Sequence, residues 1–378
     1  MHLGNSDILM GLVAFCATLL GQHLLTPQAR RLGLIDHPAG RKDHVSPTPM
    51  TGGIAMLVGV ILAGAFLVGD AGPASLGFSL SAIIVIALGA FDDRYDLPWQ
   101  LRIAVQSVAA LVMIFVGGIR IEQLGEVMGL GTGSLGLFSI PFTVFATVGV
   151  INAINMIDGA DGLAGLLALC ALVMLEAAAV YSGNGAVAHR VPILIGAVAG
   201  FLMFNLRFPW QPRARIFMGD AGSGFLGLAI ACFAIRLTQN PAHPVSSVLG
   251  LWLIPVPLVD CLVLMVRRSR NKQSPFAADR NHIHHLMIEG GFGPTQAAFA
   301  LALFTCACGL IVGQLLRLHV PHVVLLLAFV GLCMCWYWLS SPRARAIRFF
   351  QYLTSSKVPA HGVLAGADHP AGPEEESP

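Results

Sequence analysis

Long apolar runs follow one another along almost the whole of this 378-residue chain, and they constrain its fold more than any other feature. A segment needs roughly 18 apolar residues to cross a bilayer as a helix. Such runs lie at approximately 7–25, 52–69, 75–91, 101–118, 137–154, 163–182, 190–206, 221–238, 246–266, 295–316 and 320–340. Only 11% of the residues are charged, against about 25% in a soluble domain. We therefore expect an all-α, polytopic integral membrane protein with about 11 (10–11) transmembrane helices.

The positions of the basic residues predict which way the chain crosses the membrane. Lys and Arg accumulate in cytoplasmic loops. If the N-terminus lies outside, all but four of the 22 Lys and Arg fall in or beside the inner segments, at about 26–51, 92–100, 155–162, 207–220, 267–294 and 341–378. The bias predicts an N-terminus on the outer side and a C-terminus in the cytoplasm. The net charge of +2 does not point to nucleic acid as a partner.

The sequence predicts one domain followed by a C-terminal tail. No linker divides it and no repeat of fixed period is visible, so we expect a single transmembrane domain over residues 1–353. Residues 354–378 are rich in Pro, Gly and charge, with little apolar surface to bury. That composition is typical of a disordered segment, and here it would be a cytoplasmic one.

Acidic, amide and histidine residues gather on the predicted cytoplasmic side. The first inner segment holds Gly33-Leu-Ile-Asp36-His37-Pro38 and Gly40-Arg41-Lys42-Asp43-His44. The later ones hold Phe91-Asp92-Asp93-Arg94-Tyr95-Asp96, Asn152-Ala-Ile-Asn155-Met-Ile-Asp158-Gly159-Ala-Asp161-Gly162, Met218-Gly219-Asp220-Ala221-Gly222-Ser223 and Asp279-Arg280-Asn281-His282-Ile283-His284-His285. Because the arginines set the orientation independently, the agreement predicts one site at this face.

Three carboxylates in these motifs suggest a divalent cation. Asp92 and Asp93 are adjacent at a predicted helix end, where their repulsion favours a counter-charge. Ligands that are all oxygen select Mg²⁺ or Mn²⁺ over zinc. Asp220 stands at a predicted helix start, where free backbone N–H groups favour phosphate, so it would be a metal ligand next to that phosphate. The alternatives are a solvated acidic loop for the pair and a plain N-cap for Asp220.

The third motif predicts a polar stripe that ends at a helix break. Asn152, Asn155, Asp158 and Asp161 recur every three residues, so a helical turn places them along one side. The glycines after the two aspartates predict a break that leaves carboxylates and backbone free to meet a ligand. Amides paired with carboxylates suit a nucleobase or sugar hydroxyls, and a polar helix cap is the alternative.

The histidine motif predicts contacts with phosphate. His282, His284 and His285 lie close to Arg280 and further basic residues, and their spacing is not the i, i+4 pair of a helical zinc site. Imidazoles beside arginines suit donors to a pyrophosphate, with ordinary surface histidines as the alternative.

Asp260 is a further candidate because it falls inside an apolar segment, near its inner end. Local pairing with Arg267 or Arg268 is the competing interpretation.

Together these groups indicate divalent-metal phosphoryl chemistry at the membrane surface, without naming a substrate. A transporter is the second class considered, since acids within membranes also serve proton-coupled transport. Transporters place such residues near the midplane, often with inverted repeats, whereas here the acids lie at one face and no repeat shows.

The motifs FDDRYDL, NAINMIDGADGLAG, IFMGDAGSGFLG and SPFAADRNHIHHL resemble those of the polyprenyl-phosphate N-acetylhexosamine-1-phosphate transferases, or glycosyltransferase family 4. The resemblance covers about residues 7–340 in motif order and helix number. It is closest to the branch that makes undecaprenyl-diphospho-GlcNAc in the bacterial inner (cytoplasmic) membrane, the first membrane step of O-antigen or other cell-envelope polysaccharide synthesis. The related muramoyl-pentapeptide branch typically has three consecutive histidines, whereas this chain has His282-Ile283-His284-His285.

The resemblance implies a Mg²⁺-dependent transfer, with Mn²⁺ left open as the ion. Undecaprenyl phosphate and UDP-GlcNAc would give GlcNAc-diphospho-undecaprenol and UMP. UDP-N-acetylfucosamine and UDP-MurNAc-pentapeptide are the alternative donors. The partners are then undecaprenyl phosphate, a UDP-N-acetylhexosamine and the lipid bilayer, with no nucleic acid and with a homodimer left open.

The resemblance also assigns roles to individual residues. Catalytic roles fall to the carboxylates of Asp92, Asp93, Asp158 and Asp161, with Asp92 as candidate base. The metal ligands would be Asp220, Asp92 and Asp93. Contacts with the substrates would come from Asn152, Asn155, Arg280, His282, His284, His285, Asp36 and Lys42.

Two mechanisms remain open. A lipid phosphate has a second pKa of about 6, so it is largely dianionic at neutral pH and can attack without a base. We prefer this direct attack over a covalent aspartyl-phosphate intermediate.

Overall fold

The computed structural model describes residues 4–37, 47–65, 72–125, 134–275 and 279–355. Helices dominate it, because a backbone surrounded by lipid must satisfy its hydrogen bonds within each segment. The main helices are α1 (Asn5–Leu25), α3 (Gly52–Ala65), α4 (Pro73–Tyr95), α5 (Trp99–Phe115), α6 (Ser139–Ile157), α7 (Leu163–Ser182), α9 (Val191–Asn205), α10 (Gly219–Thr238), α11 (Leu249–Leu253), α12 (Pro255–Arg270), α14 (Pro294–Arg317), α15 (His322–Ser340) and α16 (Arg343–Thr354).

Short elements connect these helices. They are η1 (Thr26–Gln28), α2 (Ala29–Leu32), η3 (Gly136–Phe138), α8 (Gly185–Ala188) and α13 (Ile283–Glu289). Strands β1 (Ile35–Asp36) and β2 (Thr48–Pro49) pair antiparallel, with Asp36 opposite Thr48.

The prediction of an all-α polytopic membrane protein is confirmed. Each predicted apolar segment contains a helix, and eight helical spans in the described residues are long and apolar enough to cross a membrane. Large apolar side chains face outward, as lipid requires; Phe145 and Leu303 are each 72% exposed. The predicted segment 246–266 is broken at Ile254 into α11 and α12, where Pro255 begins the new helix. The figure of eleven crossings stays a prediction.

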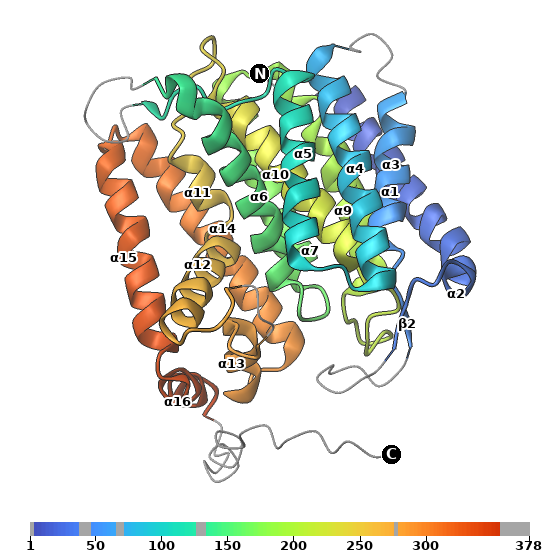
Figure 1. Cartoon of the computed structure of the whole chain (residues 1–378), viewed down its shortest axis with the longest axis vertical. Coiled ribbons are helices and arrows are strands. Elements are labelled where there is room, and N and C mark those ends of the chain that lie inside the picture. Colours follow the sequence, from blue (N-terminus) through green and yellow to red (C-terminus); the bar gives the residue numbers. More distant parts are fainter. Residues whose placement is uncertain (1–3, 38–46, 66–71, 126–133, 276–278, 356–378) are drawn as a thin grey trace, which may run out of the picture.

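Helix α10 occupies the centre of the bundle (Figure 1). In an 18-residue stretch of α10, 83% of the residues are buried, whereas the share is 22% in the span that begins with α1 and in α15. Helix α10 packs against α3, α4, α6 and α7. Glycines permit this closeness, since a Cβ on Gly53 of α3 or on Gly89 of α4 would meet the backbone of α10 at Gly222 or Ala221. Small residues at helix contacts are the usual means of close packing in membranes.

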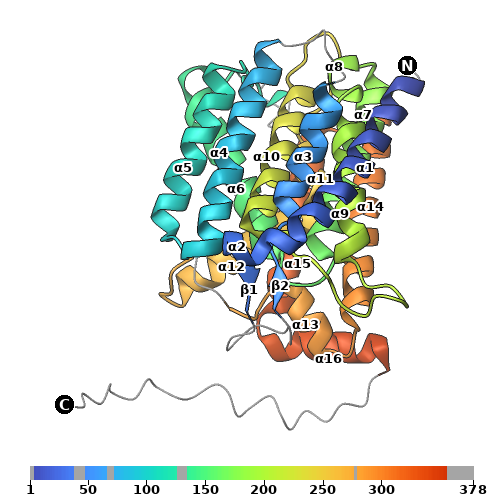
Figure 2. The same cartoon turned by 90° about the vertical axis from the view of Figure 1, so that its right-hand side faces the viewer.

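The described parts of the polar motifs, at the ends of α4 and α6 and the starts of α10 and α13, lie at one end of the bundle, opposite the start of α1 (Figure 1). The same end carries the β1–β2 hairpin, α13 and α16, and Figure 2 shows α16 lying across the axis of the spanning helices. We refer to it below as the motif end.

Helix α16 secures α13 in place. Arg343 of α16 donates to the carbonyl oxygen of Arg280 and to Oδ1 of Asn281, both at 3.0 Å, and pairs with Glu289. The Phe350 ring packs edge-on against Phe292, with the ring centroids 5.9 Å apart.

Candidate active site

Asp92 and Asp93 lie in the last turn of α4, at the helix end where the sequence placed them. The helix continues past the predicted end at residue 91 because its carboxylates have partners. Asp92 Oδ1 accepts the Leu97 backbone N–H at 2.8 Å, and α4 then ends at Asp96, whose φ of 50° is left-handed. This places both acids on a helix that packs against α10.

The carboxylates of Asp92 and Asp220 share one cation within the protein. Arg102 of α5 lies with Nη1 2.8 Å from Asp92 Oδ2 and 3.7 Å from Asp220 Oδ2. Asn155 of α6 donates to Asp220 Oδ1 at 2.6 Å and to Ser223 Oγ at 3.0 Å. Two acids from different helices are thereby brought together, with a guanidinium offsetting their charge.

A small polar cavity lies among these side chains. Its volume is about 20 Å³, which is room for a single water-sized species. Asn152 lines it as well, and its amide donates to Gln106 Oε1 at 2.7 Å.

Asp93 caps the start of α10. Its Oδ1 accepts the Asp220 backbone N–H at 2.8 Å, and its Oδ2 accepts that of Ala221 at 3.5 Å. The expectation of free N–H groups for phosphate at this helix start is therefore wrong for these two groups, because a carboxylate of the chain already occupies the positive helix end. The assignment of Asp93 as a metal ligand stays a prediction.

The predicted break in the third motif is present. Helix α6 ends at Ile157 with Asp158 as its C-cap, and Gly162 precedes α7 with a φ of 79° that favours glycine. Asp161 does not point to the small cavity. Its Oδ2 accepts from Arg207 Nε at 2.7 Å and from the Ala214 N–H at 3.1 Å, which fixes the segment between α9 and α10.

Asp158, the C-cap of α6, has an altered proton affinity. Burial, followed by the charges of Asp220 and Asp161, raises the pKa of Asp158 to about 7. A carboxyl group with that pKa exchanges a proton near neutral pH, which suits acid–base work.

The histidine motif meets the third motif at Gly159. A Cβ on this glycine would lie 2.6 Å from His284 Nε2 and 3.7 Å from His285 Nε2. The His284 and His285 rings are 4.2 Å apart, and His282 is 5.6 Å from His284, measured between centroids. The two motifs, more than a hundred residues apart in sequence, are therefore in direct contact.

His284 is buried without a partner. It is fully enclosed, and neither ring nitrogen has a hydrogen-bond partner within the described ranges. Burial, followed by the charges of His285 and His282, holds the pKa of His284 well below its usual range, so its imidazole is neutral at pH 7. A buried polar group without a partner is rare in proteins, and a ligand that supplies the bond would explain it.

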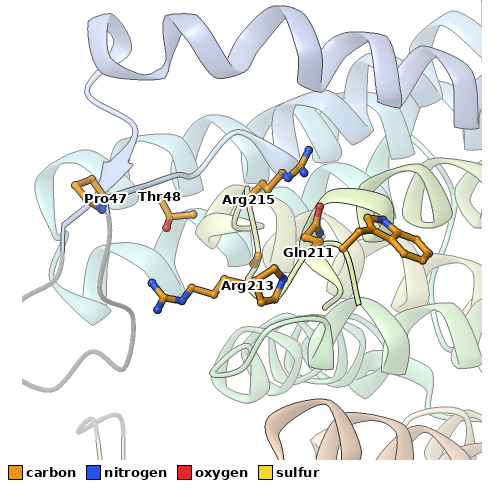
Figure 3. A pocket seen from close by; sticks show the side chains of 8 residues that line it. Pro47, Thr48, Gln211, Arg213 and Arg215 are labelled. Atoms are coloured by element: carbon orange, nitrogen blue, oxygen red, sulfur yellow. The ribbon is translucent and has the colours of Figure 1, made fainter. Parts of the chain in front are cut away.

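A second, larger pocket lies beside the β1–β2 hairpin. It measures about 560 Å³ and is lined by Pro47, Thr48 and the segment from Trp210 to Arg215. Figure 3 shows Arg213 and Arg215 on this wall. Two guanidinium groups give the pocket a positive character suited to anions.

The remaining candidates that the structure describes are spread over the motif end. Asp36 lies in β1, on the hairpin that borders the larger pocket. Arg280 has an exposed side chain, and its carbonyl oxygen accepts from Arg343. Lys42 lies outside the described residues.

Sequence reasoning missed Arg102 and Gln106 as site residues. They stand four residues apart on α5, so both face the same side of that helix. A charged and an amide residue near the end of an apolar segment were the available signal.

Arg102→Gln is expected to lower the free energy of unfolding by roughly 1–3 kcal/mol, since Asp92 is buried and loses its charged partner. Added Mg²⁺ should restore part of this loss by replacing the missing positive charge. Thermal unfolding in detergent with and without Mg²⁺ measures both effects. Arg120→Gln, in an exposed pair with Glu122, is the matched control. An equal response of the two variants to Mg²⁺ would contradict the expectation.

Comparison with known proteins fits this geometry. Residues 75–238 match the family described as glycosyl transferase family 4. A relative from Haemophilus influenzae is 36% identical over 299 residues, covering 79% of this chain and 84% of its own length. The chain belongs to glycosyl transferase family 4. The matched range of this family 4 member runs from α4 to α10 and so includes Asp92, Asn155 and Asp220, whereas the histidine motif lies beyond it.

Further relatives agree along most of the chain. A protein from Pasteurella multocida is 33% identical over 90% of this chain and 95% of its own length. One from Escherichia coli strain K12 is 34% identical over 80% of this chain and 82% of its own. These two and the Haemophilus protein are named undecaprenyl-phosphate alpha-N-acetylglucosaminyl 1-phosphate transferase.

Proposed function

We propose that this family 4 member transfers GlcNAc 1-phosphate from UDP-GlcNAc to undecaprenyl phosphate and releases UMP. The reaction would take place at the cytoplasmic face of a bacterial inner membrane, the side on which most of the basic residues are predicted to lie. The observation that carries the proposal is the meeting of Asp92, Asn155 and Asp220 at the motif end, in a chain whose relatives bear this name.

The donor set of the small cavity fits a magnesium ion. Mg²⁺ is usually bound through one or two carboxylates together with substrate phosphates, and Asp92 and Asp220 supply two carboxylates that now share Arg102. Across the described ranges, no three His, Cys, Asp or Glu side chains converge closely enough to hold an ion alone. The phosphates would complete the coordination. When bound, the ion would offset the negative charge that develops on the phosphoryl oxygens.

The protein's own residues would bind and orient the two phosphates. Asn155 fixes the direction of the Asp220 carboxylate through its 2.6 Å hydrogen bond. His284 is enclosed without a hydrogen-bond partner, and it would donate to a phosphate or sugar oxygen once substrate binding displaces the groups that cover it. His285 and Arg280 lie on the same motif and would add donors.

The transfer itself needs little from a protein base. An oxygen of the lipid phosphate attacks the phosphorus that carries the sugar, and the bond from that phosphorus to the UMP oxygen breaks. The attacking phosphate is largely dianionic at neutral pH, so no proton has to be removed first. The task of the site is then to hold the two phosphates in line and to offset their charge.

UMP release by the purified protein tests the proposal. In detergent with Mg²⁺ and undecaprenyl phosphate, UDP-GlcNAc is expected to support turnover at least about 10-fold faster than UDP-N-acetylfucosamine or UDP-MurNAc-pentapeptide. Chelation of the divalent ion should stop the reaction. A preference for either other donor would replace the sugar assignment, and no UMP from any donor would refute the activity.

The same assay separates the two mechanisms. Direct attack predicts that UMP appears only when the lipid phosphate is present. Release of UMP from UDP-GlcNAc and enzyme alone, with ping-pong kinetics, would establish the covalent route instead.

A further inference from the structure

Asp260 makes contacts that the sequence did not suggest. It lies in α12 and is 2% exposed. Its Oδ2 is 2.9 Å from His282 Nδ1, and its Oδ1 accepts from the Ile283 backbone N–H and from Trp336 Nε1, both at 3.1 Å. One carboxylate on α12 thus joins the start of α13 to α15.

The two arginines considered as alternative partners of Asp260 bind elsewhere. Arg268 donates to Asp279 Oδ2 at 3.0 Å. Arg267 donates to the carbonyl oxygens of Ser340 and Asn281, both at 3.2 Å. The local pairing considered from the sequence is therefore wrong, and the carboxylate is directed at the histidine motif.

The contact decides which nitrogen of His282 carries the proton. An ionised carboxylate only accepts hydrogen bonds, so His282 Nδ1 must donate. Nε2 is then the nitrogen left for any other partner. The same carboxylate accepts the N–H of Ile283, the first residue of α13, so ring orientation and helix start are fixed together.

We infer that Asp260 is a positioning residue for the reaction, because it holds His282 in the Nδ1–H form and leaves Nε2, without a proton, to accept a hydrogen bond from a hydroxyl group of the donor substrate. This inference rests on the proposed function, since the hydroxyl group is that of the UDP-linked sugar donor. His282 belongs to the cluster against Gly159, through its 5.6 Å ring contact with His284. A carboxylate behind a functional histidine commonly fixes its tautomer and ring orientation.

Asp260→Asn tests the inference because an amide cannot serve all three donors. If the amide oxygen faces Ile283 and Trp336, the NH₂ group faces His282 Nδ1 and forces the ring into the Nε2–H form. We expect kcat for UMP formation to fall by about 10- to 100-fold, as for other carboxylates behind functional histidines. Trp336→Phe removes one hydrogen bond to the same carboxylate and leaves His282 untouched, so it should stay within about 3-fold of the native rate.

A double-mutant cycle separates positioning from a purely structural role. If Asp260 acts through His282, Asp260→Asn should cost less than about 3-fold when introduced into His282→Ala. An equal loss in both backgrounds would overturn the inference, as would a single Asp260→Asn variant within 3-fold of the native rate. Thermal unfolding of each variant checks that the fold is kept.

A measurement that does not depend on enzyme turnover completes the test. Nitrogen-15 NMR of the histidine-labelled native protein, with His282→Ala identifying the signal, should show His282 as the Nδ1–H form, and Asp260→Asn should convert it to Nε2–H. An Nε2–H form in the native protein would overturn the inference even if Asp260→Asn did not fold. Native protein that gives no UMP while showing the Nδ1–H form would refute the proposed function alone.

Discussion

Asp220→Asn is expected to lower UMP formation by about 10²- to 10³-fold, the usual effect of removing one group that stabilises transition-state charge. Asp220 supplies one of two carboxylates at the small cavity, and its direction is set by Asn155. The amide has the same shape but lacks the charge that would hold a divalent ion. Initial rates at saturating donor and lipid phosphate, across a Mg²⁺ titration, measure the loss.

The fold should survive this change, since it relieves repulsion with Asp92 instead of breaking a core contact. Glu122→Gln provides the matched carboxylate-to-amide control. Glu122 follows α5 at the opposite end of the bundle, where its side chain is exposed and pairs with Arg120. It should keep activity within about 2-fold. Full activity of the Asp220 variant would remove Asp220 from the metal site.

Gly89→Ala is expected to have the second large effect, a loss of stability of the helix bundle. The added Cβ would fall on the backbone of α10 at Asp220 and Ala221. Because α10 is enclosed by its neighbours, α4 has to move away from it. Overpacking costs about 1–3 kcal/mol even against side chains, so we expect at least the upper value here. Thermal unfolding and residual UMP formation should fall together, because α4 carries Asp92 and α10 carries Asp220.

Gly149→Ala is the control for that variant. Gly149 lies within α6, and a Cβ there meets nothing within 4 Å. Alanine in place of an unconstrained helical glycine stabilises by roughly 0.5–1 kcal/mol, so the midpoint of unfolding should stay or rise. Equal stability of the two variants would show that the contact of α4 with α10 is looser than described.

The apolar pattern predicted the helices well, for a simple physical reason. Burial in lipid is decided by local composition, so each predicted segment contains a helix. The helix break before α7 and the start of α10 were likewise marked by glycines and by Asp220. These features depend on near neighbours in the chain.

The partners of the polar side chains could not be predicted in the same way. Arg102 reaches Asp92 and Asp220, and Asp93 caps α10, only because glycines let α4 and α10 pack closely. Such pairings depend on which helices are neighbours, and apolar composition does not encode that. Helix α16 was missed for another reason: it is short, amphipathic and basic, and an apolar window does not detect it.

The contacts between α16 and α13 affect the order in which the parts of the site form during synthesis of the enzyme. The carboxylates on α4 and α10 leave the ribosome well before the histidine motif. Arg343 binds the segment from Arg280 to Glu289, and it is made more than fifty residues after that segment begins. Because chains fold largely from the N-terminus during synthesis, the acidic half of the site forms first. The histidine half is secured only when the final described helix has emerged, so an unfinished chain would carry the acids of α4 and α10 without a fixed histidine motif.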